Sequence, residues 1–146
     1  MGHAGRARAR ACTAVVAALV TGGCGEPTAP EDVSFSFYTQ VVFGFPSLVT
    51  EARVADDHSV VVTGIVRTRH TGYTVLGELD SSGQRALLMS VFATQTSNGL
   101  NFPTQNYYAG TIQGLTTGQY NLQVRHIIDH DRTDTVVALR QTVTVR

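Results

Sequence analysis

Apolar residues recur at every second position along most of the chain after residue 58. In 118–128, for example, Tyr120, Leu122 and Val124 alternate with polar residues. A period of two places the apolar side chains on one face of a half-buried strand. Glycine-rich or polar clusters separate these runs, as they do between strands. The pattern predicts six strands, within 58–69, 72–80, 84–95, 106–115, 118–128 and 135–145.

The region before residue 58 adds one or two strands. Val33, Phe35 and Phe37 alternate with polar residues, and Pro46 interrupts the apolar run that follows. No part of the chain shows apolar spacing typical of a helix over three turns. We therefore expect an all-β fold, a two-sheet antiparallel sandwich of about seven strands. The turn after the second predicted strand is expected at 81–83.

A local motif in the fifth predicted strand sharpens this expectation. Leu115, Gly118 and Tyr120 precede a regular alternation. The motif resembles the tyrosine corner of immunoglobulin-like and fibronectin type III-like sandwiches, in which the tyrosine hydroxyl bonds back across the preceding corner. The resemblance covers Ser59 to Val145 and implies an immunoglobulin-like sandwich, although the disulfide and the tryptophan of antibody domains are absent. Because this fold hosts many functions, the resemblance predicts no activity.

The N-terminus has the order of parts of a secretory signal peptide. Arg6, Arg8 and Arg10 supply positive charge, and the short apolar run 13–20 follows. A membrane span needs roughly 20 apolar residues, so this run is too short to be one. The segment is therefore left out of the fold prediction.

The end of this segment resembles the lipobox of bacterial lipoproteins. Gly22, Gly23 and Cys24 match its small residues and cysteine, while Thr21 stands where the family prefers an aliphatic residue. The resemblance implies that Cys24 carries the lipid and becomes the first mature residue. Gly25, in place of an aspartate retention signal, implies the outer membrane. Ordinary cleavage and secretion is the alternative.

These features divide the chain into three parts. We expect a lipoprotein signal peptide at 1–23, a flexible polar tether at 24–32 and one immunoglobulin-like domain at 33–146. Cys12 leaves with the signal peptide, so no disulfide is expected in the domain.

Charge excludes one class of partner. The chain has eleven basic residues, all arginine, and eleven acidic ones. Removing 1–23 leaves eight arginines against eleven carboxylates, so the formal charge is 8 − 11 = −3. A mildly acidic domain lacks the basic stripe of a nucleic-acid binder, so no nucleic acid is expected.

The stretch "HIIDHDRTD" (126–134) holds the strongest candidate chemistry. His126, His130, Asp129, Asp131 and Asp134 could form a metal site, and this metal-binding alternative stays open. However, His126 shares parity with the inward residues of its strand, whereas His130 falls in the connection to the last strand. A polar, Asp-rich hairpin tip accounts for the rest. We expect His126 at the core edge, bonded to a neighbouring strand or loop.

Other candidate catalytic groups are weaker. His58 with Asp56 and Asp57 could be part of a triad, and Glu78 with Asp80 could serve as a carboxylate pair. Polar loop and rim positions explain both sets more simply. Because no nucleophile motif is present, a small hydrolase is the least favoured function.

Aromatic residues raise two further questions. Tyr107 and Tyr108 are neighbours in one strand, so they should face opposite sides of the sheet, one core and one exposed. Four phenylalanines lie near the start of the domain and either fill the core or form an exposed edge that recruits a partner strand: Phe35, Phe37, Phe43 and Phe45.

Together these patterns predict a non-catalytic binding or structural module. We expect it to be exported and lipid-anchored through Cys24 in the cell envelope, at the outer membrane or a periplasmic face, with secretion as the alternative. The partner is the membrane through the lipid, plus an unknown protein or glycan. No cofactor, metal site or catalytic residue is expected. Loops at one end of the sandwich, near His58, 81–83 or 129–134, are the expected contact sites.

Overall fold

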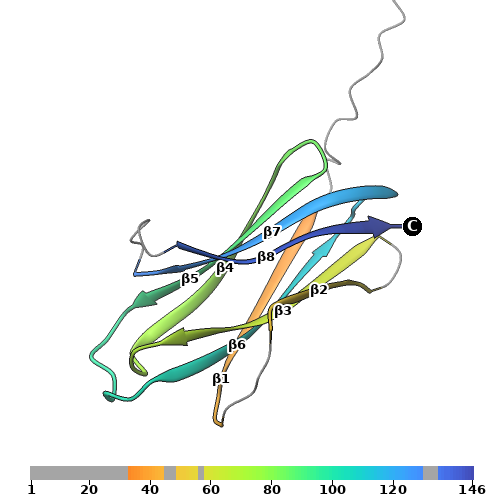
Figure 1. The fold of residues 1–146 in the computed structure, drawn as a ribbon. Coiled ribbons are helices and arrows are strands. Elements are labelled where there is room, and N and C mark those ends of the chain that lie inside the picture. The colour runs from red at the N-terminus through yellow and green to blue at the C-terminus, as the bar shows by residue number, and fades with distance from the viewer. Residues whose placement is uncertain (1–32, 45–48, 56–57, 130–134) are drawn as a thin grey trace, which may run out of the picture.

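The computed structural model describes residues 33–44, 49–55, 58–129 and 135–146. This part of the chain forms eight strands in two sheets (Figure 1). They are β1 (Ser34–Val42), β2 (Glu51–Val54), β3 (Ser59–Thr68), β4 (Tyr73–Gly83), β5 (Ala86–Gln95), β6 (Thr104–Gln113), β7 (Gly118–Ile128) and β8 (Thr135–Val145). The predicted all-β, two-sheet sandwich is confirmed.

Sheet A has the strand order β1-β6-β3-β2, with every pair antiparallel. Val60, Val62 and Val66 of β3 point inward, and β-branched residues suit such a pleated, half-buried surface. The β6 strand at the centre of the sheet alternates buried and partly exposed residues almost throughout. A period of two in the sequence therefore corresponds to one buried face in the sheet.

Sheet B has the order β4-β5-β7-β8 and contains one parallel pair, β5 with β7. The sequence predicted an antiparallel sandwich, so this pair differs from the expectation. The reason is the path of the chain, which leaves sheet B after β5, forms β6 in sheet A and returns as β7. With one strand in the opposite sheet between them, the chain reverses direction twice, so β7 runs in the same direction as β5.

The core lies between the sheets and receives side chains from both. The largest fully buried side chains come from β3, β5, β6, β7 and β8 and from the β6–β7 connection: Tyr108, Met89, Ile112, Leu115, Val60, Val62, Val66, Val91, Val124 and Val145. Each buried aliphatic or aromatic side chain of this size stabilises the fold by about 1.5–3 kcal/mol. The core residues and strands that the structure describes lie within 33–146, and a single core of this size is enough for independent folding.

Two glycines in sheet A create space for large residues in the core. A Cβ atom at Gly64 would collide with the hydroxyl group of Tyr108, and one at Gly110 would lie 2.6 Å from Cε of Met89. Glycine at these positions lets Tyr108 and Met89 cross the space between the sheets.

The β4–β5 hairpin corrects the predicted turn. Ser81–Gly83 belongs to β4, which has an irregular register between Asp80 and Gly83, and the turn is formed by Gln84 and Arg85. Arg85 adopts a φ of 53°. A bulge lets the strand run on past a polar cluster that the sequence alone marks as a loop.

The predicted tyrosine corner is present at the start of β7. The hydroxyl group of Tyr120 donates a hydrogen bond to the carbonyl oxygen of Thr116 at 3.1 Å. Tyr120 and Leu115 are both buried, as expected. The Arg85 guanidinium lies 5.4 Å from the centre of the Tyr120 ring. This cation–π contact links the turn 84–85 to the start of β7.

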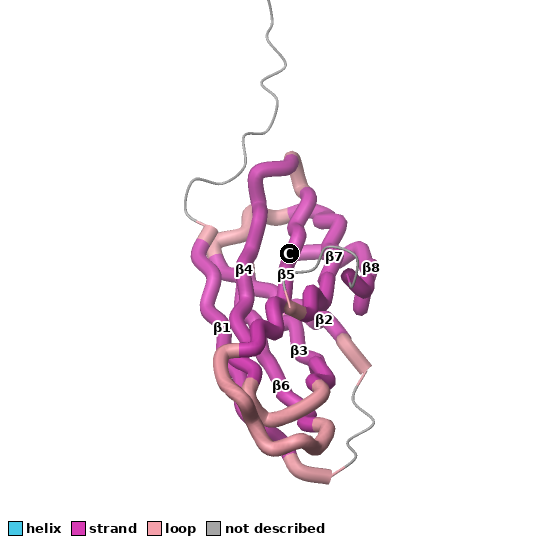
Figure 2. The backbone as a smooth tube through the Cα atoms, turned by 90° about the vertical axis from the view of Figure 1, so that its left-hand side faces the viewer, coloured by secondary structure: helices cyan, strands magenta, loops and turns pink. Residues whose placement is uncertain are grey.

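The sandwich has two ends, which we name from β1. The proximal end, where β1 begins, also holds His58, the turn 84–85 and the connection 114–117. The distal end, where β1 finishes, also holds 43–44, 69–72, 96–103 and Asp129. Figure 2 shows the strands running between these two groups of loops. The three candidate contact loops of the sequence therefore do not share one end, because His58 and Asp129 lie at opposite ends.

Candidate functional site

His126 belongs to a largely buried series of hydrogen-bonded side chains that joins the two sheets. Nε2 of His126 on β7 lies 2.8 Å from the hydroxyl oxygen of Tyr108 on β6. That oxygen lies 3.2 Å from Oγ1 of Thr50, just before β2. The rings of Tyr108 and His126 meet edge to face with centroids 5.5 Å apart. The prediction that His126 lies inward and bonds to a neighbouring strand is confirmed.

Burial favours the neutral forms of the two titratable side chains in this series, His126 and Tyr108. Desolvation lowers the pKa of His126 to about 4 and raises the pKa of Tyr108 to about 12, while the hydrogen bond from Thr50 opposes the shift at Tyr108. Burial disfavours the charged form of each group, which explains the opposite directions. A neutral imidazole bonded to a neutral phenol is a cross-link between the two sheets.

The sequence contained a weak signal for His126 and none for its partners. The parity of β7 gave the inward orientation of His126, and adjacency predicted that Tyr107 and Tyr108 face opposite sides. Tyr108 is fully buried and Tyr107 is partly exposed, which confirms that prediction. Nothing in the sequence pairs Thr50 with a tyrosine far away in the chain, because the contact depends on how the two sheets stack.

The stretch 130–134, with His130, Asp131 and Asp134, lies outside the described residues. Asp129 is described and adopts a φ of 59°. Its Oδ2 accepts a hydrogen bond from the Tyr73 hydroxyl group at 3.0 Å. Within the described ranges, no three His, Cys, Asp or Glu side chains form a group that could hold a metal ion.

A second polar cluster fastens the β3–β4 loop at the distal end. The His70 and Tyr73 rings lie 4.7 Å apart, and the backbone N–H of Gly72 donates to Nδ1 of His70 at 3.1 Å. Burial and the Asp129 carboxylate raise the pKa of Tyr73. Tyr73 and Asp129 thus connect this loop to the end of β7.

The remaining candidates from the sequence are spread over the molecule. Cys24, Asp56 and Asp57 lie outside the described residues. His58 is exposed at the proximal end, where its carbonyl oxygen accepts a hydrogen bond from the backbone N–H of Leu115 at 3.1 Å. The carboxylate pair of β4 is exposed on the outer face of sheet B. Of the triad candidates only His58 is described, and Glu78 and Asp80 lie two residues apart on the same face of β4.

The distal end carries exposed apolar side chains around a hollow of about 350 Å³. Phe43 is 85% exposed, and Leu100 in the β5–β6 loop is 68% exposed. We define the distal patch as the apolar residues that line the hollow, Val42, Phe43, Phe102 and Pro103. Arg67 lies at its border.

Of the four phenylalanines, two take the predicted core role and one is exposed. Phe35 and Phe37 pack against the core, and the Phe37 ring stacks on Tyr108 with centroids 5.9 Å apart. Phe43 is exposed in the distal patch, and Phe45 lies outside the described residues. The sequence could not separate them, because both pairs show the same alternation. Leu100 and Phe102 were missed because they lie in a loop without periodicity.

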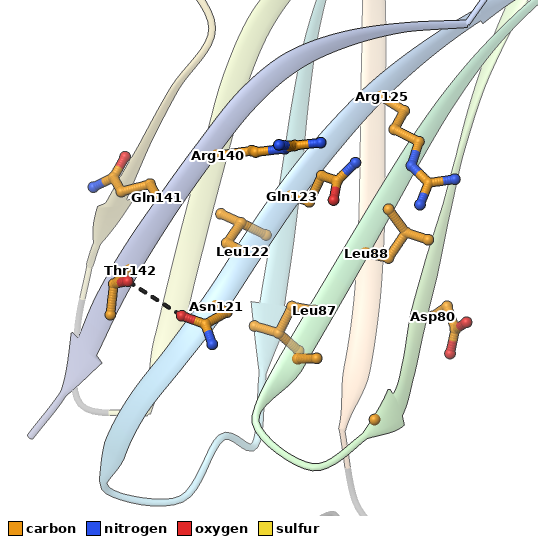
Figure 3. A pocket seen from close by; sticks show the side chains of 12 residues that line it. Asp80, Leu87, Leu88, Asn121, Leu122, Gln123, Arg125, Arg140, Gln141 and Thr142 are labelled. Atoms are coloured by element: carbon orange, nitrogen blue, oxygen red, sulfur yellow. Dashed lines mark hydrogen bonds between the residues drawn. The ribbon is translucent and has the colours of Figure 1, made fainter.

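The outer face of sheet B forms a second, shallower hollow of about 610 Å³ near the proximal end (Figure 3). Its side chains come from all four strands of the sheet and mix aliphatic, amide and charged groups. They include Asp80, Leu88, Asn121, Gln123, Arg125 and Arg140. Figure 3 shows Arg140 on the β8 side and Asp80 on the β4 side, with the Arg125 side chain reaching from β7 over β5 between them.

Comparisons with known proteins give no family. No family model matches the chain, and neither the curated proteins nor the solved structures contain a match. Among the described residues, no helix has the length and apolar character needed to cross a membrane.

Proposed function

We propose that this protein is a non-catalytic module that is tethered to the cell envelope and binds a partner protein through the distal patch. The observation that carries the proposal is the exposure of large apolar side chains around a hollow at one end of the sandwich. Contiguous apolar surface on a folded protein marks an interaction site. Aromatic residues are also enriched where proteins bind each other.

The position of the distal patch favours a protein over the anchoring membrane as its target. The tether precedes β1, and β1 runs the length of sheet A before it reaches Phe43. The distal patch is therefore at the end of the sandwich opposite to the start of β1, which the proposed tether would precede. Phe43 and Phe102 supply apolar contacts, and Arg67 at the border offers a fork of donors for a carboxylate of the partner.

The tether itself is supported by the sequence. Cys24 with its preceding glycines resembles a lipobox, and the polar segment 24–32 would separate the anchor from β1. The proposed location is the outer membrane or a periplasmic face, and the soluble, secreted form is the alternative. The immunoglobulin-like or fibronectin type III-like relationship also belongs to this proposal: the Tyr120 corner supports it, and the parallel β5–β7 pair departs from its all-antiparallel pattern.

Photocrosslinking in the native host tests the contact site. A photoreactive phenylalanine analogue at Phe43 or Phe102 should give the same discrete protein adduct. The analogue at Gln113, exposed at the proximal end, is the matched control and should give none. An equal adduct at all three positions, or none at Phe43 and Phe102, would reject the distal patch as the binding site.

Substitution of the anchor cysteine tests the tether. The full chain should partition into detergent and incorporate a labelled fatty acid, and Cys24→Ser should abolish both. Cys12→Ser is the matched control and should leave labelling unchanged. Labelling that survives Cys24→Ser, or its absence from the unsubstituted chain, would reject the lipid anchor while leaving the distal patch untouched.

A further inference from the structure

The outer face of sheet B separates its charges by strand. Glu78 and Asp80 project from β4, and Arg125 and Arg140 project from β7 and β8. The β5 strand between them contributes neutral side chains in the same two rows. Glu78, Arg125 and Arg140 form no hydrogen bond or ion pair with another described residue. The acidic side chains therefore project from one side of the face and the basic ones from the other, and Glu78 is not paired with Arg125 or Arg140.

An apolar row crosses the same face beside the charges. Leu76, Phe92 and Ile127 are aligned by the register of β4, β5 and β7. Val137 lies opposite Arg125 on β8. Leu76 is 60% exposed and Val137 is 43% exposed. No segment of the described structure covers this face. Its mixture of exposed aliphatic groups with separated charges is typical of a protein contact surface.

We propose that two copies of this chain pack through the outer faces of sheet B, related by a twofold axis that runs parallel to the strands. Such a rotation keeps each cross-strand row opposite itself and exchanges the two sides of the sheet. The acidic β4 side of one copy then lies over the basic β7–β8 side of the other, twice in one interface. The row of Leu76, Phe92 and Ile127 lies over its own copy.

The charge pattern is what selects a second copy as the occupant. A twofold contact uses the same surface on both partners, so that surface must be complementary to itself. An acidic segment of another protein would meet Glu78 and Asp80, and a basic one would meet Arg125 and Arg140. A rotated copy brings opposite charges together at both places.

The size of the face predicts a weak, concentration-dependent dimer. Four strands about 4.8 Å apart and about eight residues long at 3.3 Å per residue cover roughly 500 Å² per copy, or about 1,000 Å² in total. That area is at the low end for specific complexes. Tethering both copies to one membrane would raise their effective concentration, but the contact does not require the tether.

Sedimentation equilibrium of residues 33–146 tests the contact, since this part holds every described strand and core residue. The unsubstituted fragment should form dimers as its concentration rises. Arg125→Glu with Arg140→Glu makes the face wholly acidic, and Glu78→Arg makes it mainly basic. Each variant alone should remain monomeric, whereas an equimolar mixture of the two should form a heterodimer.

A charge-matched control lies away from the outer face of sheet B. Arg53→Glu with Arg69→Glu changes net charge as much as the acidic sheet B variant, at two exposed positions, and should still form dimers. A fragment that stays monomeric at all concentrations would overturn the proposal. So would dimers that survive either sheet B variant, a mixture that stays monomeric, or a control that loses dimers equally. Because none of these readouts involves Cys24 or the distal patch, their failure is separate from that of the proposed function.

Discussion

The two ends of the sandwich differ in how far their apolar side chains are exposed to solvent. At the proximal end, Leu115 is 2% exposed and Tyr120 closes the corner above it with a hydrogen bond to Thr116. At the distal end, Leu100 is 68% exposed and Phe43 is 85% exposed. The first end contributes to folding, and the second leaves apolar surface that the fold does not need. This difference is the reason for proposing the distal patch as the binding site.

The sharpest test of this difference is a pair of leucine substitutions. Leu115→Ala should lower the free energy of unfolding by about 3 kcal/mol, because it removes a buried side chain and leaves a cavity. Leu100→Ala should change it by less than about 0.5 kcal/mol, because its side chain is already in water. Urea denaturation of residues 33–146 measures both. Similar losses at the two positions would show that the distal loop is part of the core.

Acid should act on the buried histidine between the sheets. The pKa of His126 is about 4 in the folded protein and 6.5 for the unperturbed side chain. Between these values the unfolded chain binds a proton that the folded protein cannot, so stability is complete above pH 6.5 and falls as the pH drops toward 4. The loss reaches about 3 kcal/mol, at 1.36 kcal/mol per pKa unit.

The measurement is the free energy of unfolding at several pH values in that window. His126→Gln should flatten the part of the profile that His126 causes, and His58→Gln, at an exposed position, is the control and should keep the wild-type profile. If the stability of the wild-type protein increased as the pH was lowered from 6.5 to 4, the buried, neutral state of His126 would be contradicted.

A smaller effect is expected at the tyrosine corner. Tyr120→Phe removes the hydrogen bond to the Thr116 carbonyl and should reduce stability by about 1 kcal/mol. Tyr38→Phe is the matched control, since the Tyr38 hydroxyl group donates to Oε1 of Gln40 at 2.6 Å on the exposed surface. It should cost less than about 0.5 kcal/mol. Equal effects in thermal or urea unfolding would mean that the corner adds nothing specific to the proximal end.

The sequence could predict what depends on neighbours within one strand. Parity along β7 gave both Tyr120 and His126 their inward orientation, and the spacing from Leu115 to Tyr120 gave the corner hydrogen bond. These features follow from the pleat of a strand and from a short connection. They need no knowledge of which strands pair.

Features that depend on distant segments could not be predicted. The parallel pairing of β5 with β7 arises because β6, which lies between them in the sequence, belongs to the other sheet. The alternation of apolar and polar residues does not indicate to which sheet a strand belongs. The contact between Thr50 and Tyr108 depends on sheet stacking. Phe43 is exposed just beyond the end of β1, whereas Phe37 within β1 is partly buried against the core.

The smallest expected effect is that of metal ions. We expect no rise in melting temperature when chelator-treated residues 33–146 are titrated separately with zinc, copper and calcium. Nε2 of His126 is held by Tyr108, and the Asp129 carboxylate accepts a hydrogen bond from Tyr73. A metal that bound only the folded state would add about 2.7 kcal/mol at a hundredfold excess over its dissociation constant.

Two alanine variants would assign any rise that did occur. A rise lost in His126→Ala would mean that the buried series of side chains opens to bind metal, and the cross-link between the sheets would then be a ligand site. A rise lost in His130→Ala but kept in His126→Ala would place the metal in the connection between β7 and β8. In either case the protein would hold a metal site in addition to the proposed distal patch. An unchanged melting temperature leaves exposed phenylalanine and leucine side chains as the chemistry that distinguishes this end from the other.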